Sequence, residues 1–254
     1  MFTVYHFIWL AVCAVILVAG FRLLMTRRPP LRDLLTLCCI GAAASEIIKV
    51  FCTIQLVPSV DGSTLLPYLE LKQLPFHICA LQIFFIYYAR FARDSKFKEA
   101  LMAFMYPAGM IGAAIALCVP TVFTEVIPAT RAFTHPMGYQ YFLYHTMLIL
   151  MGGYIAFSGQ VDIKPKHYLT SVGFLSVFAF FSLYINSMFS IPIYENGVLT
   201  SVQYGVNFLF TYRPPIDIAF TQPWHWLFYL GIIAALALGL IALCYIPVFR
   251  KNRK

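Results

Sequence analysis

The spacing of the apolar segments constrains the fold of this chain more than any other feature. Continuous apolar runs recur along almost the whole length and leave room only for the connections between them. They fall near residues 7–25, 33–55, 75–92, 99–118, 139–158, 167–190 and 223–248. Each is close to the roughly 20 residues that a helix needs to cross the hydrocarbon core. None alternates as a membrane barrel strand would. We therefore predict an all-α polytopic membrane bundle of seven transmembrane helices, forming one domain over residues 1–254.

The distribution of charge supports a membrane protein and sets its orientation. Charged residues make up 11% of the chain, against about a quarter in soluble domains. Most lysines and arginines sit in alternate turns or at the C-terminal end: Arg22, Arg27, Arg28, Arg32, Arg90, Arg93, Lys96, Lys98, Lys164, Lys166, Arg250, Lys251, Arg253 and Lys254. This asymmetry predicts an outer N-terminus and a cytoplasmic C-terminus. The net charge of +8 is thereby explained without nucleic acid, which we do not expect as a partner.

The cysteines do not form the pattern of a disulfide framework. All seven lie inside or at the ends of apolar segments, as buried thiols do: Cys13, Cys38, Cys39, Cys52, Cys79, Cys118 and Cys244. No histidine, cysteine or carboxylate pair has the spacing of metal ligands, and no phosphate-binding glycine loop is present. We expect neither a metal nor a cofactor.

Two outer connections are unusually apolar. Residues 56–74 are apolar enough to lie along the membrane interface. Residues 191–222 contain an Asn-Gly turn signal at 196–197. Because exposed backbone is not tolerated in lipid, this second connection should pack against the bundle or re-enter it.

Polar side chains gather in the outer half of the predicted bundle. At ~1.5 Å per residue, Cys79, His145, Lys49, Glu46 and Asn186 all fall there, on four different helices. The cytoplasmic half has no comparable set. Ionisable groups at such depths are functional candidates by default.

The hexapeptide Leu-Pro-Phe-His-Ile-Cys at residues 74–79 holds two chemically capable residues. Pro75 suits the first position of a helix, which would place Cys79 just beyond the first turn, where the helix N-terminus favours a thiolate. His77 would point away from Cys79 around that helix. The best candidate for a general base is therefore His145, and a Cys–His pair is the usual arrangement for nucleophilic acyl transfer.

Each of these residues also has a structural interpretation. Cys79 could be a small packing residue, and His145 could be an interhelical hydrogen-bonding group. Glu46 and Lys49 are three residues apart on one helical face, where we expect them to neutralise each other. Asparagines in spans, and the loop residue Asn207, more often hold elements together than bind ligands.

The hexapeptide resembles the Leu-Pro-x-His-x-Cys signature of YwaF-type integral membrane proteins, which are related to transmembrane protein 164, a cysteine-dependent lipid acyltransferase. The resemblance extends to Glu46 and to further stretches at residues 141–145, 207–210, 213–215 and 223–226. There are departures from the family pattern: Ala80 replaces an acidic residue, the segment between Asn186 and Asn207 is longer, and His225 stands where proline is common.

The resemblance implies that Cys79 accepts an acyl chain as a thioester, with His145 as general base and a membrane phospholipid as donor. It also implies that His77 orients the site or binds the headgroup and that Glu46 supports it. Lys49, Gln82 and Asn207 are further candidates for a supporting or substrate-binding role. A bacterial plasma membrane is the expected location. The alternatives are a small-molecule or lipid transporter, or a non-catalytic seven-helix receptor or partner subunit. The absence of an internal repeat disfavours a transporter, and the short cytoplasmic turns disfavour a receptor.

Overall fold

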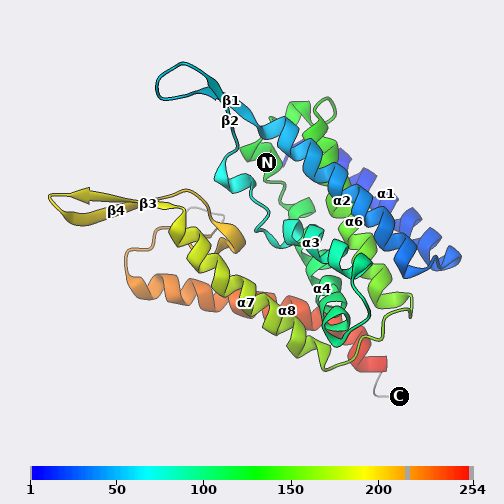
Figure 1. Cartoon of the computed structure of the whole chain (residues 1–254). Helices are drawn as coiled ribbons and strands as arrows, with labels where there is room; N and C mark the ends of the chain where they lie inside the picture. The colour runs from blue at the N-terminus through cyan, green and yellow to red at the C-terminus, as the bar shows by residue number, and fades with distance from the viewer. Residues whose placement is uncertain (1, 215–217, 252–254) are drawn as a thin grey trace.

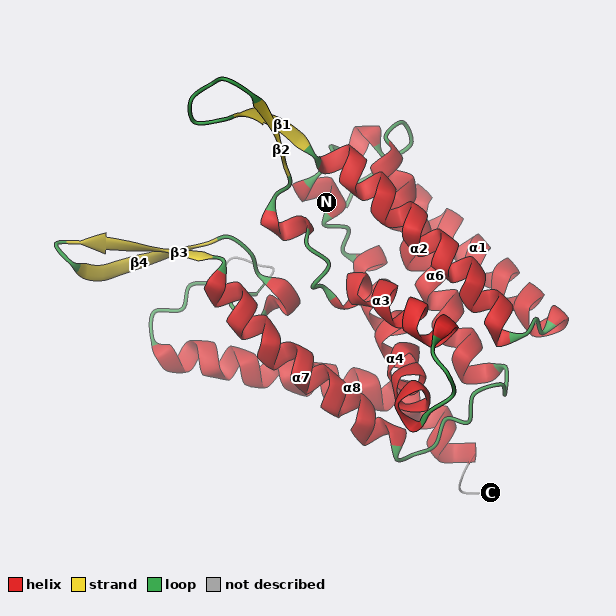
Figure 2. Cartoon of the chain, viewed as in Figure 1, coloured by secondary structure: helices red, strands yellow, loops and turns green. Residues whose placement is uncertain are grey.

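The computed structural model describes residues 2–214 and 218–251, and long helices dominate it (Figures 1 and 2). In order they are α1 (Val4–Arg27), α2 (Leu31–Thr53), α3 (Ile78–Phe91), α4 (Lys96–Cys118), α6 (Pro136–Phe157), α7 (His167–Met188) and α8 (Pro223–Lys251); α5 (Val122–Glu125) is a single turn. The seven long helices match the seven predicted apolar runs to within three residues at each end. Pro215, Arg253 and Lys254, which entered the sequence argument, lie outside the described residues.

Five of these helices are long and apolar enough to cross a membrane. They are α1, α2, α4, α7 and α8. The helix α3 has only 14 residues, about 21 Å at the usual rise. The helix α6 has 22 residues but carries polar side chains such as Gln140 and His145. Length and composition therefore indicate a predominantly helical integral membrane protein with five evident spans.

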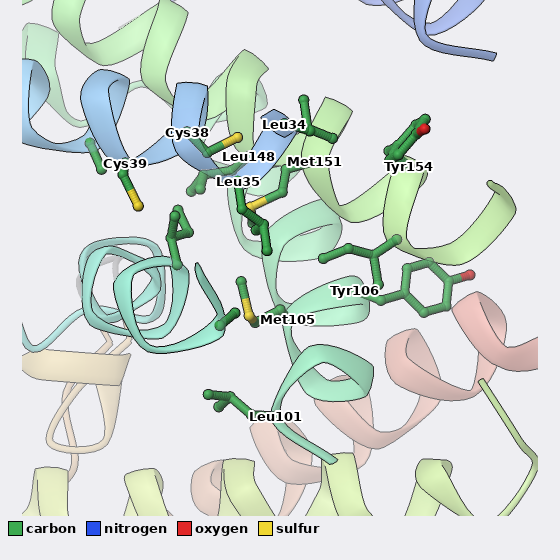
Figure 3. Packing of buried hydrophobic residues seen from close by; sticks show 14 of the residues in the cluster. Leu34, Leu35, Cys38, Cys39, Leu101, Met105, Tyr106, Leu148, Met151 and Tyr154 are labelled. Carbon is green, nitrogen blue, oxygen red and sulfur yellow. The ribbon is translucent and has the colours of Figure 1, made fainter. Parts of the chain in front are cut away.

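The core forms where α4 and α6 pack against each other and against their neighbours. The helix α6 also contacts α1, α2 and α3, and α4 also contacts α3, α7 and α8. Glycines allow the close approach: a Cβ atom at Gly109 would lie 3.2 Å from the carbonyl oxygen of Leu148, and one at Gly152 would lie 2.9 Å from that of Tyr106. Figure 3 shows the resulting apolar cluster of α2, α4 and α6 side chains.

Two β-hairpins extend from one end of the bundle, and neither strand pair was predicted. The first pairs β1 (Gln55–Pro58) with β2 (Leu65–Tyr68), and the second pairs β3 (Ser190–Glu195) with β4 (Val198–Tyr204). The N-terminus lies at this hairpin end and the C-terminus at the opposite end (Figure 1).

The predicted Asn-Gly turn closes the second hairpin. Asn196 (φ 51°) and Gly197 (φ 78°) both take the left-handed conformation that tight hairpin turns require. This part of the prediction is confirmed.

The start of α3 corrects the sequence prediction. Pro75 is not the first helical residue, because the chain stays extended through His77 (φ −73°, ψ 149°) and the helix begins at Ile78. Cys79 is therefore the second residue of α3, inside its first turn. The argument that helical rotation turns His77 away from Cys79 fails, since His77 precedes the helix as its N-cap.

Candidate functional site

Cys79 lies at the N-terminus of α3, against α4. The first helical hydrogen bond of α3 runs from the Leu81 amide to the His77 carbonyl (2.8 Å), so the amides before Leu81 have no acceptor within the helix. The thiol faces Gly112 of α4, where a Cβ atom would lie 3.2 Å from the Cys79 Sγ. Only a glycine leaves this space free. The partial positive charge of the helix N-terminus favours a thiolate or an oxyanion at this point.

Tyr144 of α6 fixes the first turn of α3. Its hydroxyl donates a 2.8 Å hydrogen bond to the Cys79 carbonyl oxygen, and its side chain is buried. Tyr144 is also close enough to Glu46 to interact with it electrostatically.

His145 is buried on α6, and its ring is held by its own helix. Its Nδ1 lies 2.6 Å from the carbonyl oxygen of Tyr141. A carbonyl only accepts, so in the neutral ring Nδ1 carries the proton and Nε2 holds the free lone pair. This is the tautomer that a general base needs.

The structure does not join His145 directly to Cys79. Within residues 2–214 and 218–251 no hydrogen bond connects the two side chains. Cys79 adjoins Gly112 of α4, while Tyr141, whose carbonyl holds the His145 ring, donates its hydroxyl to the Ala116 carbonyl at 2.8 Å, one turn further along α4. Their direct contact remains a prediction.

The predicted neutral pair of Glu46 and Lys49 is confirmed. The Lys49 Nζ lies 2.8 Å from a Glu46 carboxylate oxygen and donates to the Gln73 carbonyl at 2.9 Å. The Lys49 charge also acts electrostatically on the His77 ring. Lys49 therefore connects α2 to the extended segment that leads into Cys79.

A loop after the second hairpin folds back over His77. The rings of Phe208 and Phe210 lie 5.1 Å and 6.1 Å from the His77 ring, centroid to centroid. Leu209 and Phe210 both have positive φ, which is uncommon for residues other than glycine. The predicted packing of this connection against the bundle is thus confirmed, and it supplies two aromatic neighbours of His77.

Two asparagines hold this loop in place. The buried Asn186 accepts from the Phe208 amide (2.8 Å) and donates to the Phe208 carbonyl (3.0 Å) and to the Thr211 hydroxyl (2.9 Å). Asn207 bonds the backbone of Tyr212 and Arg213 in the same way. The side-chain amides of Asn186 and Asn207 therefore hold the loop in its conformation.

Gln82 is the most unusual polar residue of the site. Its side chain is fully buried in α3, one turn past Cys79, on the stripe that Ile86 and Ala89 continue into the core. Neither its Oε1 nor its Nε2 has a hydrogen-bond partner among the described residues.

A family model described as the TMEM164 family matches residues 1–245. The chain belongs to the TMEM164 family. The predicted relationship to transmembrane protein 164 is therefore confirmed, while the YwaF-type label stays a prediction. Neither a search of curated proteins nor a search of solved structures finds a match to the chain.

In this TMEM164-family chain, sequence analysis missed two features of the site. Tyr144 stood in the aromatic run before His145, but nothing in the sequence indicated that its hydroxyl would reach across to α3. Gly112 lies in an apolar span in which nothing distinguishes it from the other glycines.

An apolar groove of about 300 Å³ lies between α1, α2 and α6, and none of the predicted site residues lines it.

Proposed function

We propose that this protein is a membrane-embedded, cysteine-dependent acyl-transfer enzyme that acts on phospholipid acyl chains. Cys79 is the nucleophile and His145 the general base. The observation that carries the proposal is the placement of Cys79 in the first turn of a helix, with its thiol in the space left by Gly112 and its backbone fixed by Tyr144. The proposal includes seven membrane crossings, an outer N-terminus and a plasma-membrane location.

The chemistry is a two-step acyl transfer. The His145 Nε2 takes the thiol proton, and the Cys79 sulfur attacks the ester carbonyl carbon, whose π electrons move to oxygen. The resulting tetrahedral oxyanion collapses, the ester C–O bond breaks, and the lysophospholipid alkoxide leaves with the proton held by His145. An acyl thioester remains on Cys79. A hydroxyl acceptor, either water or a second lipid alcohol, then gives its proton to the His145 Nε2 and attacks the thioester carbonyl carbon. The C–S bond breaks, and the Cys79 thiolate that leaves takes the proton back from His145.

The surrounding groups have supporting roles in this proposal. The pair of Lys49 and Glu46, together with His77, forms a polar border to the site that suits a phospholipid headgroup. Asn207 keeps the covering loop folded. The same ion pair weakens the transporter hypothesis, because the carboxylate that ion coupling would use is already neutralised by Lys49.

The proposal is tested by locating an acyl group on the protein. Purified protein is incubated with vesicles of mixed phosphatidylcholine, phosphatidylethanolamine and phosphatidylglycerol, and its intact mass is measured with and without hydroxylamine. We expect a hydroxylamine-labile acyl adduct that peptide mapping assigns to Cys79. The absence of an adduct, or an adduct spread over several cysteines, would contradict acyl transfer at this site.

His145→Gln is expected to slow adduct formation by about 100-fold to 10,000-fold at neutral pH, the usual contribution of a general base. The glutamine amide can still donate to the Tyr141 carbonyl, so the fold should persist. The deficit should shrink as the pH rises, because hydroxide can then remove the thiol proton. The rate is followed by intact mass across pH.

His135→Gln is the matched control for this change. His135 caps the N-terminus of α6, where its Nδ1 accepts from the Met137 amide at 3.2 Å. Its replacement should leave the adduct rate and its pH dependence unchanged. Equal losses in both variants would remove His145 from the role of base.

A further inference from the structure

Gln82 stands apart from the other buried polar side chains of the bundle. Its side chain has no exposed area, and both of its polar atoms lack a partner within the described part of the chain. Among the described residues one other buried side chain, His6, has an unpartnered atom, but its Nε2 bonds the Leu117 carbonyl at 2.8 Å. An amide buried without any hydrogen bond destabilises the fold. A bound ligand would supply the hydrogen bonds that the fold does not give to the Gln82 amide.

The position of Gln82 on the helix shows where that ligand would lie. Residues three apart share a helical face, so Gln82 lies directly below Cys79. Long side chains in α-helices point back over the preceding turn, toward the helix N-terminus. We therefore expect the Gln82 amide to point to the first turn of α3, where the thiol and the backbone amides without an acceptor in the helix are located.

We infer that Gln82 is a catalytic residue that binds the carbonyl oxygen of the acyl group transferred to Cys79. The Gln82 Nε2 donates to this oxygen together with the backbone amides of the first turn of α3. The ligand is therefore an ester or thioester carbonyl. This inference rests on the proposed function and extends it.

The chemical role of Gln82 is to stabilise the charge that develops during attack. When the sulfur bonds to the carbonyl carbon, the π electrons move to oxygen, and that oxygen needs donors already in place. A neutral amide in a buried site provides such a donor without a change of protonation. The same oxygen is again an oxyanion when the acceptor attacks the thioester, so Gln82 serves both steps.

Replacement of Gln82 by methionine separates a catalytic role from a packing role. Methionine has nearly the same shape but no donor, and it removes two unpartnered polar atoms from the core. We expect Gln82→Met to raise the melting temperature of the full-length protein. We expect it to slow acyl-adduct formation from the mixed phospholipid vesicles by about 100-fold or more.

Alkylation of Cys79 by iodoacetamide separates the two roles. If Gln82 only maintained the packing around Cys79, its replacement would change the alkylation rate as well as the acylation rate. This displacement forms no oxyanion, so peptide mapping should show the same alkylation rate at Cys79 in Gln82→Met and in the parent. The matched control is Gln140→Met, which loses the 2.7 Å hydrogen bond from Gln140 to the Ser45 hydroxyl. That variant should have a lower melting temperature and an unchanged adduct rate.

The outcomes distinguish this inference from the proposed function. An unchanged adduct rate in Gln82→Met would overturn the role of Gln82 and leave Cys79 as nucleophile. Parallel losses of acylation and alkylation, or a lowered melting temperature, would make Gln82 a packing residue. If the parent protein formed no adduct at all, the proposed function would fail and the carbonyl-binding role with it.

Discussion

Cys79→Ser is expected to abolish the hydroxylamine-labile adduct, a loss of at least about a thousandfold in its rate of formation. Serine is close to cysteine in size, but its hydroxyl is a far weaker nucleophile than a thiol at neutral pH. Because the Tyr144 hydroxyl bonds the backbone carbonyl of residue 79, this contact survives the substitution. The free energy of unfolding should change by only about 0.5 kcal/mol or less. Intact mass and thermal melting measure the two effects.

Cys118→Ser is the control for adventitious acylation. Cys118 is the last residue of α4 and is solvent-exposed in the structure, whereas Cys79 is partly covered. Spontaneous transfer to an accessible thiol would therefore favour Cys118. We expect the adduct to persist in Cys118→Ser at the parent level. An adduct lost in Cys118→Ser and kept in Cys79→Ser would identify a chemical artefact and leave Cys79 as a packing residue.

The helices were predictable from sequence because lipid imposes one simple rule on them. A backbone that crosses the hydrocarbon must bond within itself, so long apolar runs become helices and their ends fall near the first charged or turn residues. The predicted run at 167–190, for example, agrees with α7 to within two residues.

The start of α3 escaped prediction because Pro75 is compatible with both a helix start and an extended chain. The Lys49 ammonium bonds the Gln73 carbonyl, and Phe76 packs its ring 5.4 Å from that of Phe208. These long-range contacts hold the approach to Ile78 extended. No local sequence signal reports them.

The site was only partly predictable for the same reason. Their estimated depth placed Cys79, His145, Glu46 and Lys49 in the same half of the bundle, and the structure brings the last two into an ion pair. Depth does not give direction around a helix, however. Whether Gln82 has a partner depends on the side chains of other helices, which the sequence does not order in space.

Asn186→Leu is expected to destabilise the protein by about 3 kcal/mol. Leucine has the same branched arrangement of heavy atoms as asparagine, but it removes three hydrogen bonds to the covering loop and leaves the buried Phe208 amide without its acceptor. The melting temperature should fall by about 6–12 °C. Hydrogen exchange should rise across residues 205–213, because the loop loses its attachment to α7.

Ser187→Leu provides the matched control for Asn186→Leu. Ser187 is adjacent on α7 but exposed, so leucine there removes no contact to the loop. Its exchange pattern and melting temperature should resemble those of the parent. A similar loss in both variants would indicate a general effect of leucine at the end of α7.

The loop also covers His77, so its release has a consequence for the site. Phe208 and Phe210 pack on the His77 ring only while the Asn186 hydrogen bonds hold their backbone, with Leu209 and Phe210 in a left-handed conformation that costs free energy. Once these bonds are lost, that conformation has little to sustain it. We therefore expect Asn186→Leu to increase the alkylation of Cys79 by iodoacetamide while it slows acyl transfer, because access rises as the order of the site falls. A variant that melts early but transfers acyl groups at the parent rate would show that the loop stabilises the bundle without contributing to the chemistry.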